Sequence, residues 1–353
     1  MKKYFVMAAL AVSTLTASAQ SVVPKWINNV KLSGFGIVQY TYNGQENNES
    51  NSFNLRLARL GLDGRAFDDW YWTAQIQFNG NTSTLGSSPK LDDLCIEWQK
   101  DDFLRVKAGQ FKNPFTYENP MHPIDQGFMS YSQVISKFAG FSDRAGAHSS
   151  NGRDIGVQLQ GDFLKNASGR NLIHYQVGVF NGQGINVKDV DQQKNIIGGA
   201  WVMPVEGMRL GAFGWIGSYA RKGTSASEGI TNTTLRRLQQ RRYAFSAEYK
   251  VDDWTFRSEY VHSTGYAFAK AMVNTNDASA KDITLSSNGD KSQGVYALVI
   301  APIIKKKCHA KARYDMYQPS KGAEKQRTQY EIGLDYYFNK NICLTGEYAY
   351  IHD

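Results

Sequence analysis

Basic side chains gather at the two ends of the longest segment that lacks strand character, residues 111–152. Arg105 and Lys107 lead into this segment, and Arg153 follows it. Ammonium and guanidinium groups around a narrow aqueous passage attract anions, because selectivity depends on the width of the passage and on the charge at its constriction. Six basic residues are candidates for such a constriction: Arg105, Lys107, Lys112, Lys137, Arg144 and Arg153.

A second set of cations follows the alternation of the predicted strands and shares one face with acidic residues. These wall candidates are Arg59, Arg65, Arg242, Lys311 and Arg313. Each of them can pair with a carboxylate on a neighbouring strand, which would give it a structural role. Within residues 111–152, Lys112, Lys137 and Arg144 are balanced by three acidic residues. The charge count therefore leaves both anion preference and general hydrophilic passage open.

Two histidines raise the alternative of hydrolysis. His174 and His309 fall on the polar face of predicted strands, but no serine pattern accompanies either of them. The sequence has no phosphate-loop, zinc-protease or calcium-loop motif. Its three cysteines contain no Cys-x-x-Cys pair and are too few for a disulfide framework. We therefore expect no catalytic residue, no metal and no cofactor.

The N-terminus has the pattern of an export signal. Lys2 and Lys3 precede an apolar stretch over residues 5–15, and Ala17-Ser18-Ala19 then gives a small-x-small cleavage pattern. We expect residues 1–19 to be a signal peptide, cleaved between Ala19 and Gln20, and residues 20–353 to form one barrel domain. Removal of residues 1–19 lowers the formal net charge from +8 to +6. Export makes nucleic acid an improbable partner of this basic chain.

Composition excludes several fold classes. Aromatic residues make up 13% of the 353 residues, and the mean hydropathy is −0.46. Beyond the N-terminus no apolar run approaches the roughly 18 residues of a membrane-spanning helix. So aromatic a chain also has ample surface to bury, which argues against disorder. A β-rich protein remains, either a large soluble sandwich or a transmembrane barrel.

Alternation and loop rhythm favour the barrel. In residues 70–78, Trp72, Ala74 and Ile76 share one face, while Gln75 and Gln77 share the other. Aromatic residues cluster at strand ends, as in the interfacial girdles of outer-membrane barrels, and short and long connections alternate strictly. The predicted strands are fifteen: 30–43, 53–67, 70–79, 91–99, 102–110, 153–163, 171–181, 194–203, 207–219, 241–251, 253–263, 292–301, 306–318, 328–338 and 341–351.

Two irregularities accompany this pattern. The second strand changes phase between Leu57 and Leu60, which predicts either a β-bulge or a boundary between the loop wall and the membrane band. The strand count is odd, whereas bacterial single-chain barrels have an even number of strands. An unpaired edge in lipid would leave a row of backbone groups unsatisfied. We therefore expect a barrel of 16 strands and a sequence that lacks the last one.

The segment 111–152 is expected to fold into the lumen. It holds three prolines and several aromatic residues, and loops of this length are usually functional. Inside a barrel its aromatic side chains can pack while its polar groups narrow the passage. The alternative is an external lid or a contact between subunits.

Four segments carry a recognisable family pattern. They read FNLRLARLGLDGR at 53–65, RVKAGQFKNPF at 105–115, GRDIGV at 152–157 and GVFNG at 178–182. In these segments the sequence resembles the phosphate-selective porin O and P family. The resemblance implies a 16-stranded outer-membrane barrel, usually a homotrimer, whose third external loop folds inward and whose basic residues guide phosphate or other anions. It fixes no individual phosphate-binding residue.

The interpretation of the whole chain is an outer-membrane porin for passive diffusion of small hydrophilic solutes, with a possible preference for phosphate or other anions. Its expected partners are outer-membrane lipid, such solutes and further copies of the chain in a homotrimer, and its expected location is the outer membrane of a Gram-negative bacterium. One alternative is a structural or adhesin-like barrel that presents loops 220–240 and 264–291. A barrel-embedded hydrolase is a weaker alternative.

Overall fold

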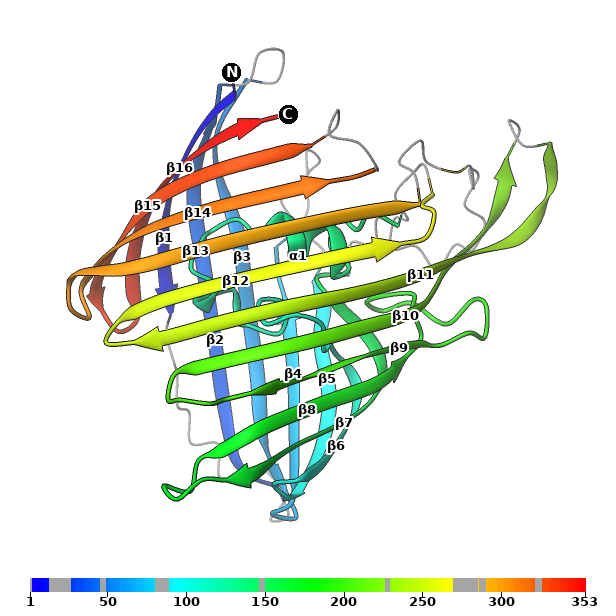
Figure 1. Cartoon of the computed structure of the whole chain (residues 1–353), viewed down its shortest axis with the longest axis horizontal. Helices are drawn as coiled ribbons and strands as arrows, with labels where there is room; N and C mark the ends of the chain where they lie inside the picture. Colours follow the sequence, from blue (N-terminus) through cyan, green and yellow to red (C-terminus); the bar gives the residue numbers. More distant parts are fainter. Residues whose placement is uncertain are drawn as a thin grey trace.

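Sixteen antiparallel strands close into one barrel in the computed structural model (Figure 1). The structure describes residues 2–12, 27–44, 49–79, 89–145, 150–225, 229–268, 285, 290–320 and 326–353. The strands are β1 (Lys2–Val12), β2 (Ile27–Asn43), β3 (Ser50–Ala66), β4 (Trp70–Gln77), β5 (Lys90–Asp101), β6 (Leu104–Lys112), β7 (Arg153–Lys165), β8 (Asn171–Phe180), β9 (Asn195–Val202), β10 (Met208–Ser225), β11 (Ile230–Val251), β12 (Trp254–Thr264), β13 (Lys291–Ile304), β14 (Cys308–Gln318), β15 (Arg327–Asn339) and β16 (Ile342–His352).

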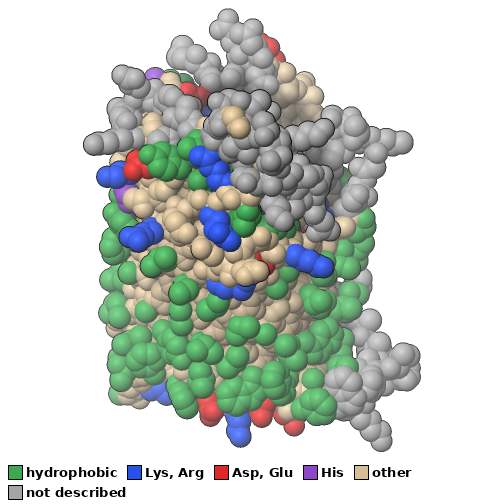
Figure 2. Space-filling view, turned by 90° about the vertical axis from the view of Figure 1, so that its right-hand side faces the viewer, with side chains coloured by type: hydrophobic (Ala, Val, Ile, Leu, Met, Phe, Trp, Pro, Cys, Tyr) green, Lys and Arg blue, Asp and Glu red, His purple; other side chains and the backbone are tan. Residues whose placement is uncertain are grey.

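The alternation of side chains puts apolar groups outside and charged groups inside. On β15, Tyr330 and Ile332 are 52% and 60% exposed, whereas Glu331 and Asp335 are 4% and 7% exposed. This is the reverse of a soluble sandwich, and it suits a wall with lipid on one side and a polar lumen on the other. Figure 2 shows hydrophobic side chains over much of the outer surface. The barrel prediction is confirmed.

The connections alternate between short and long, as the sequence predicted. Short turns follow β3, β5, β11, β13 and β15, and several hold residues with positive φ, among them Asp68 and Asp252. The long connections lie at the opposite end, which is the external end in outer-membrane barrels. No helix in the described part of the chain is both long and apolar enough to cross a membrane.

Residues 220–240 were predicted to be an external loop, and this was wrong. β10 and β11 continue as a paired ribbon on either side of residues 226–228, and Figure 1 shows it extending past the barrel. The register pairs Ala220 with Arg237 and Arg221 with Arg236. A segment whose side chains alternate between two faces, and which lacks a strong turn signal, can extend a hairpin. Each additional residue pair forms further backbone hydrogen bonds.

The fifteen strands predicted from residue 30 onward are all present, and β1 occupies the remaining position. β1 pairs with β16 through Lys2 and Ile351, and with β2 through Tyr4 and Asn43. Sequence reasoning had set these residues aside as part of a signal peptide. With 11 residues, β1 is long enough to pair its backbone groups with both β2 and β16. Cleavage after Ala19 stays a prediction.

β3 contains a β-bulge, but it lies at Arg56, just before the predicted position between Leu57 and Leu60. The register of β2 against β3 shifts between Ile37 and Val38, opposite Leu57 and Leu55. One extra residue therefore moves the following side chains of β3 to the other face, so that Arg59 points inward.

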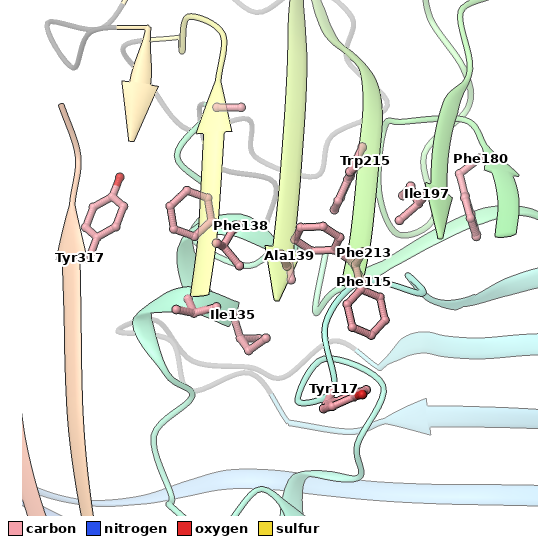
Figure 3. Packing of buried hydrophobic residues seen from close by; sticks show 14 of the residues in the cluster. Phe115, Tyr117, Ile135, Phe138, Ala139, Phe180, Ile197, Phe213, Trp215 and Tyr317 are labelled. Carbon is pink, nitrogen blue, oxygen red and sulfur yellow. The ribbon is translucent and has the colours of Figure 1, made fainter. Parts of the chain in front are cut away.

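Residues 113–145 and 150–152, here called the inward loop, fold into the barrel as predicted. The described part of this loop contains a short 3-10 helix, Pro123–Asp125, and α1 (Gln133–Phe138), which packs against β12, β13 and β14. Figure 3 shows Phe115 near Trp215 and Phe138 near Tyr317, and the ring centroids of these pairs lie 5.5 and 5.7 Å apart. Each buried phenyl ring contributes about 2 kcal/mol to holding the loop inside.

Candidate functional site

Carboxylates on the β12–β16 wall hold the backbone of the inward loop. Glu259 on β12 accepts hydrogen bonds from the backbone N–H groups of Tyr117 and Glu118, at 2.6 and 2.9 Å. Asp315 on β14 accepts one from the N–H of Gln133 at 2.7 Å. Further along the wall, Glu347 accepts one from the N–H of Met129 at 2.9 Å. These bonds satisfy loop donors that burial would otherwise leave unpaired.

Cations on the same wall bind the carbonyl groups of the loop. Arg313 and Lys311 donate to the carbonyls of Ser130 and Gly127 at 3.0 and 2.8 Å. Arg242 on β11 donates to the carbonyl of Phe138 and forms an ion pair with Asp143 at 2.7 Å. The same side chains also pair with wall carboxylates, for example Arg313 with Glu331 at 2.5 Å and Lys311 with Asp335 at 2.7 Å. The wall candidates Arg242, Lys311 and Arg313 therefore hold the loop in place.

The opposite side of the inward loop borders a cavity of about 260 Å³, here called the basic cavity. Its charged lining consists of four cations, Arg59, Lys107, Lys112 and Arg153, and one carboxylate, that of Asp93. The polar lining also includes four amides, Gln75, Gln158, Gln160 and Gln176, together with Thr73 and His122. Cationic and amide donors together can replace part of the hydration shell of an anion.

The two arginines of the basic cavity are paired, and the two lysines are not. Arg59 lies 2.9 Å from Asp92, and Arg153 lies 2.7 Å from Asp93. Lys112 donates to the carbonyl oxygen of Met121, and the ammonium of Lys107 lies 4.7 Å from the ring centroid of Phe111.

Within the described ranges, neither lysine has a carboxylate oxygen within 4 Å. Glu97 is the register partner of Lys107, but its carboxylate accepts a hydrogen bond from Gln160. Among the four cations of the basic cavity, Lys107 and Lys112 are therefore the two that no described carboxylate neutralises.

His122 on the inward loop lies beside these cations. Its ring centroid is 4.5 Å from that of Phe35. Burial, together with the positive charges of Lys112, Arg59 and Arg153, lowers the pKa of His122 from 6.5 to about 4. The imidazole is therefore neutral at physiological pH, and protonating it would add a fifth positive charge to the cavity.

Acidification should weaken the folded loop through His122. Because the folded pKa lies below the ordinary value, the unfolded chain binds the extra proton between about pH 6.5 and 4, and stability falls as the pH drops through that window. We expect the midpoint of thermal unfolding to fall more steeply from pH 7 to pH 4 in the wild type than in His122→Gln. Parallel pH profiles for the two proteins would contradict this assignment.

Three of the six constriction candidates lie away from the basic cavity. Arg105 sits near the periplasmic end of β6 and pairs with Asp162. Lys137 on α1 lies 5.9 Å from the ring centroid of Tyr317, and its burial lowers the pKa of its ammonium. Arg144 donates to the carbonyl of Gly265 at 2.6 Å.

The wall candidate Arg65 is also outside the basic cavity. It donates to the carbonyl of Asp68 at 3.0 Å, in a periplasmic turn. The structure thus brings together Arg59, Lys107, Lys112 and Arg153 from the eleven cations that the sequence raised.

Sequence reasoning missed the amides, the aspartates and the histidine of this site. Gln158 and Gln160 alternate on β7, as Gln75 and Gln77 do on β4, so repeated inward glutamines were a usable signal. Asp92 and Asp93 gave no such signal, because only their cross-strand partners show that they neutralise Arg59 and Arg153.

A second cavity, of about 530 Å³, lies on the periplasmic side of the inward loop. Its lining mixes cations and carboxylates, including Arg209, Lys250, Asp125 and Asp335. The imidazole of His309, which also lines it, is 3.9 Å from Asp253. Both cavities border the inward loop, and Met121 lines each of them.

The two histidines considered for hydrolysis contact aspartates. The Nδ1 atom of His174 lies 2.7 Å from Asp162, and its ring stacks on Trp201 with centroids 4.0 Å apart. In the part of the chain that the structure describes, no serine hydroxyl hydrogen-bonds to His174 or His309. Nor do the described residues contain a group of three or more potential metal ligands.

Comparison with known proteins places this geometry in context. The structure is similar to the outer membrane channel DcaP of Acinetobacter baumannii, with a TM-score of 0.52, 11% identity, and coverage of 99% of this chain and 96% of that chain. It is also similar to an anion-selective porin from Comamonas acidovorans, with a TM-score of 0.52, 13% identity, and coverage of 99% and 98%. At these identities the likeness concerns the fold. No curated protein matches the chain.

The sequence supplies the more specific relationship. Residues 33–191 match the profile of the phosphate-selective porin O and P family. The matched region includes β3, β6, the inward loop and every residue that lines the basic cavity. The chain therefore has the closed β-barrel fold of outer-membrane porins, and its residues 33–191 match the sequence pattern of the phosphate-selective porin O and P family.

Proposed function

We propose that this porin lets small hydrophilic solutes diffuse across the outer membrane and favours anions, which pass through the basic cavity. One observation carries the proposal: Lys107 and Lys112 face this cavity with no carboxylate within 4 Å in the described ranges, while the inward loop is bound to the other wall. Phosphate is the anion that the family relationship suggests. Its negative oxygens would accept hydrogen bonds from ammonium groups and from the nearby glutamines.

The proposal is tested by reconstituting the full chain in a planar bilayer under a salt gradient. We expect ohmic channels whose reversal potential has the sign of anion preference, and we expect phosphate to reduce the chloride current. Absence of conductance from a correctly folded barrel would refute the porin function. A cation-selective reversal potential would refute the anion preference alone.

Among the sequence candidates, we propose that Arg59, Lys107, Lys112 and Arg153 act on the permeating solute. The two arginines would act mainly by orienting aspartates and amides, because each is already paired. Arg242, Lys311, Arg313 and Arg144 would act on the loop, since their donors reach its backbone or neighbouring carbonyl groups.

We also propose that the chain assembles as a homotrimer and has no catalytic activity, as the family relationship suggests. Cross-linking in detergent should give a trimer band. A non-transporting, adhesin-like barrel is the second candidate, and the projecting β10–β11 ribbon is the observation that favours it. A folded barrel without conductance that binds cells or matrix through this ribbon would support the second candidate.

Processing of the N-terminus gives a separate prediction. We expect the protein purified from outer membranes to begin at Gln20, because Ala17-Ser18-Ala19 follows a short apolar segment. Residues 2–12 form β1 here. They are therefore either part of the mature barrel or removed with the signal peptide. Intact-mass measurement distinguishes them: a mass that includes residues 2–12 would contradict cleavage.

A further inference from the structure

Two exposed cations stand on the outer face of the barrel at its external end. The cross-strand register aligns Arg241 on β11, Thr264 on β12 and Lys291 on β13 in one row. Arg241 and Lys291 are both exposed. Neighbouring strands lie about 4.8 Å apart, so the two positions are separated by roughly 10 Å. Figure 2 shows Lys and Arg side chains above the hydrophobic band on one outer face.

No acidic residue of β11 to β15 shares this face with the row, and the exposed Asp290 directly precedes Lys291 just before β13 begins. The acidic residues of β11, β12, β14 and β15 are all buried on the lumen side: Glu248, Glu259, Asp315, Glu331 and Asp335. In the described ranges, the side chains of Arg241 and Lys291 form no ion pair and no hydrogen bond. These charges are thus free to meet an anion that approaches along the outer wall.

Polarity falls step by step from this row toward the middle of the wall. In the next outward row, Tyr243 stacks on His262 with ring centroids 5.2 Å apart, and Gln293 donates to Gln318 at 2.7 Å. Phe245 follows one step further down β11 and is 56% exposed. The surface thus passes from cations to amides and aromatic rings and then to apolar groups. This order complements a lipid from its anionic headgroup to its acyl chain.

An apolar groove continues down the same outer wall. It has a volume of about 500 Å³, and its outward residues include the small side chains Ala297 and Ala312 between Tyr314, Tyr330 and Tyr348. The rings of Tyr314 and Tyr330 lie 5.5 Å apart. Along β13, Ala297 is six residues from Lys291, or about 20 Å at the rise of a strand. That distance matches the length of one acyl chain below its headgroup.

We propose that this outer surface, the Arg241–Lys291 row with the groove around Ala297 and Ala312, binds a phosphorylated lipid of the outer leaflet. Arg241 and Lys291 contact the headgroup phosphate, and an acyl chain lies in the groove. Charge complementarity selects this occupant, because clusters of Lys and Arg at the membrane surface bind anionic headgroups. A second copy of the chain would bring no such phosphate to the row. The proposal goes beyond solute passage and does not depend on selectivity.

Binding of lipid A to the purified full chain in detergent tests the proposal, with native mass spectrometry as the readout. The probes are lipid A with both phosphates, lipid A without phosphate, and phosphatidylethanolamine. We expect the bis-phosphorylated probe to bind the wild type best, and the double variant Arg241→Gln/Lys291→Gln to bind it about tenfold to thirtyfold more weakly. The Arg241→Lys/Lys291→Arg variant should retain binding.

Two further variants distinguish the contribution of the groove to lipid binding from that of the cations. Lys305→Gln removes an exposed charge at the periplasmic end of the same wall and should leave binding unchanged. Ala312→Leu fills the groove and should weaken binding of every acylated probe that the wild type binds. Heat-modifiable migration in gels verifies that each variant is folded.

Three results would overturn the proposal. The first is unchanged lipid A affinity in the folded Arg241→Gln/Lys291→Gln variant. The second is equal wild-type affinity for lipid A with and without phosphate. The third is a photo-crosslinker at position 312 that joins two copies of the chain in native membranes, since the groove would then be a subunit contact.

Discussion

Replacing Lys107 and Lys112 with glutamate should convert an anion-preferring channel into a cation-preferring one. The change reverses two of the four cations that line the basic cavity, so that carboxylates outnumber cations there. At a distance of about 8 Å and an effective dielectric of about 40, each charge contributes about 1 kcal/mol to the energy of a monovalent ion. We expect the anion-to-cation permeability ratio to fall by at least about tenfold.

Reversal potentials under a salt gradient measure this ratio directly. Lys305→Glu provides the matched control, since it reverses one exposed charge in a periplasmic turn far from the inward loop. The milder Lys107→Gln/Lys112→Gln variant should give an intermediate ratio and weaken the block by phosphate. An unchanged reversal potential in the folded double-glutamate variant would place the selective site outside the basic cavity.

The second large effect is expected from releasing the inward loop. In Glu259→Ala, the N–H groups of Tyr117 and Glu118 lose their shared acceptor, and so do the hydroxyls of Ser246 and Tyr296. Each unsatisfied buried donor costs about 1–3 kcal/mol, so the start of the loop should detach from the wall. We expect a larger single-channel conductance and faster tryptic cleavage after Lys137.

Glu97→Ala is the control for this loop prediction. Glu97 is also a buried wall carboxylate, but it accepts its hydrogen bond from Gln160 on β7, and no hydrogen bond joins it to the loop within the described ranges. It should leave tryptic cleavage of the loop unchanged. If Glu259→Ala keeps both the wild-type conductance and the wild-type cleavage rate, the aromatic packing around Phe115 and Phe138 alone is sufficient to hold the loop.

Alternation in the sequence was sufficient to predict the wall. Tyr330, Ile332 and Leu334 face outward and Glu331 and Asp335 face inward because a strand turns successive side chains to opposite faces. Fifteen strands, their loop rhythm, the bulge near Leu57 and the inward loop all followed from such local patterns. The ribbon of β10 and β11 did not, because its length depends on pairing between two segments that each looked like loop.

The sequence predicted which kinds of residue form the candidate site, but not which of the candidates lie together. Lys107, Lys112 and Arg153 flank the inward loop in the sequence, and the structure does place them together. Lys137 and Arg144 looked equivalent, yet one lies over Tyr317 and the other binds the carbonyl of Gly265. The difference arises because the loop binds to one wall and leaves the other open.

The sequence by itself determined that this protein is an outer-membrane barrel with a polar lumen and an inward loop, since strand period, aromatic placement and loop length are local properties of the chain. Only the tertiary structure decided which cations are free. Gln133 meets Asp315, and Arg153 meets Asp93, across separations of 182 and 60 residues. Electrostatic pairing depends on distance in space, and barrel closure sets that distance through the register of many strands.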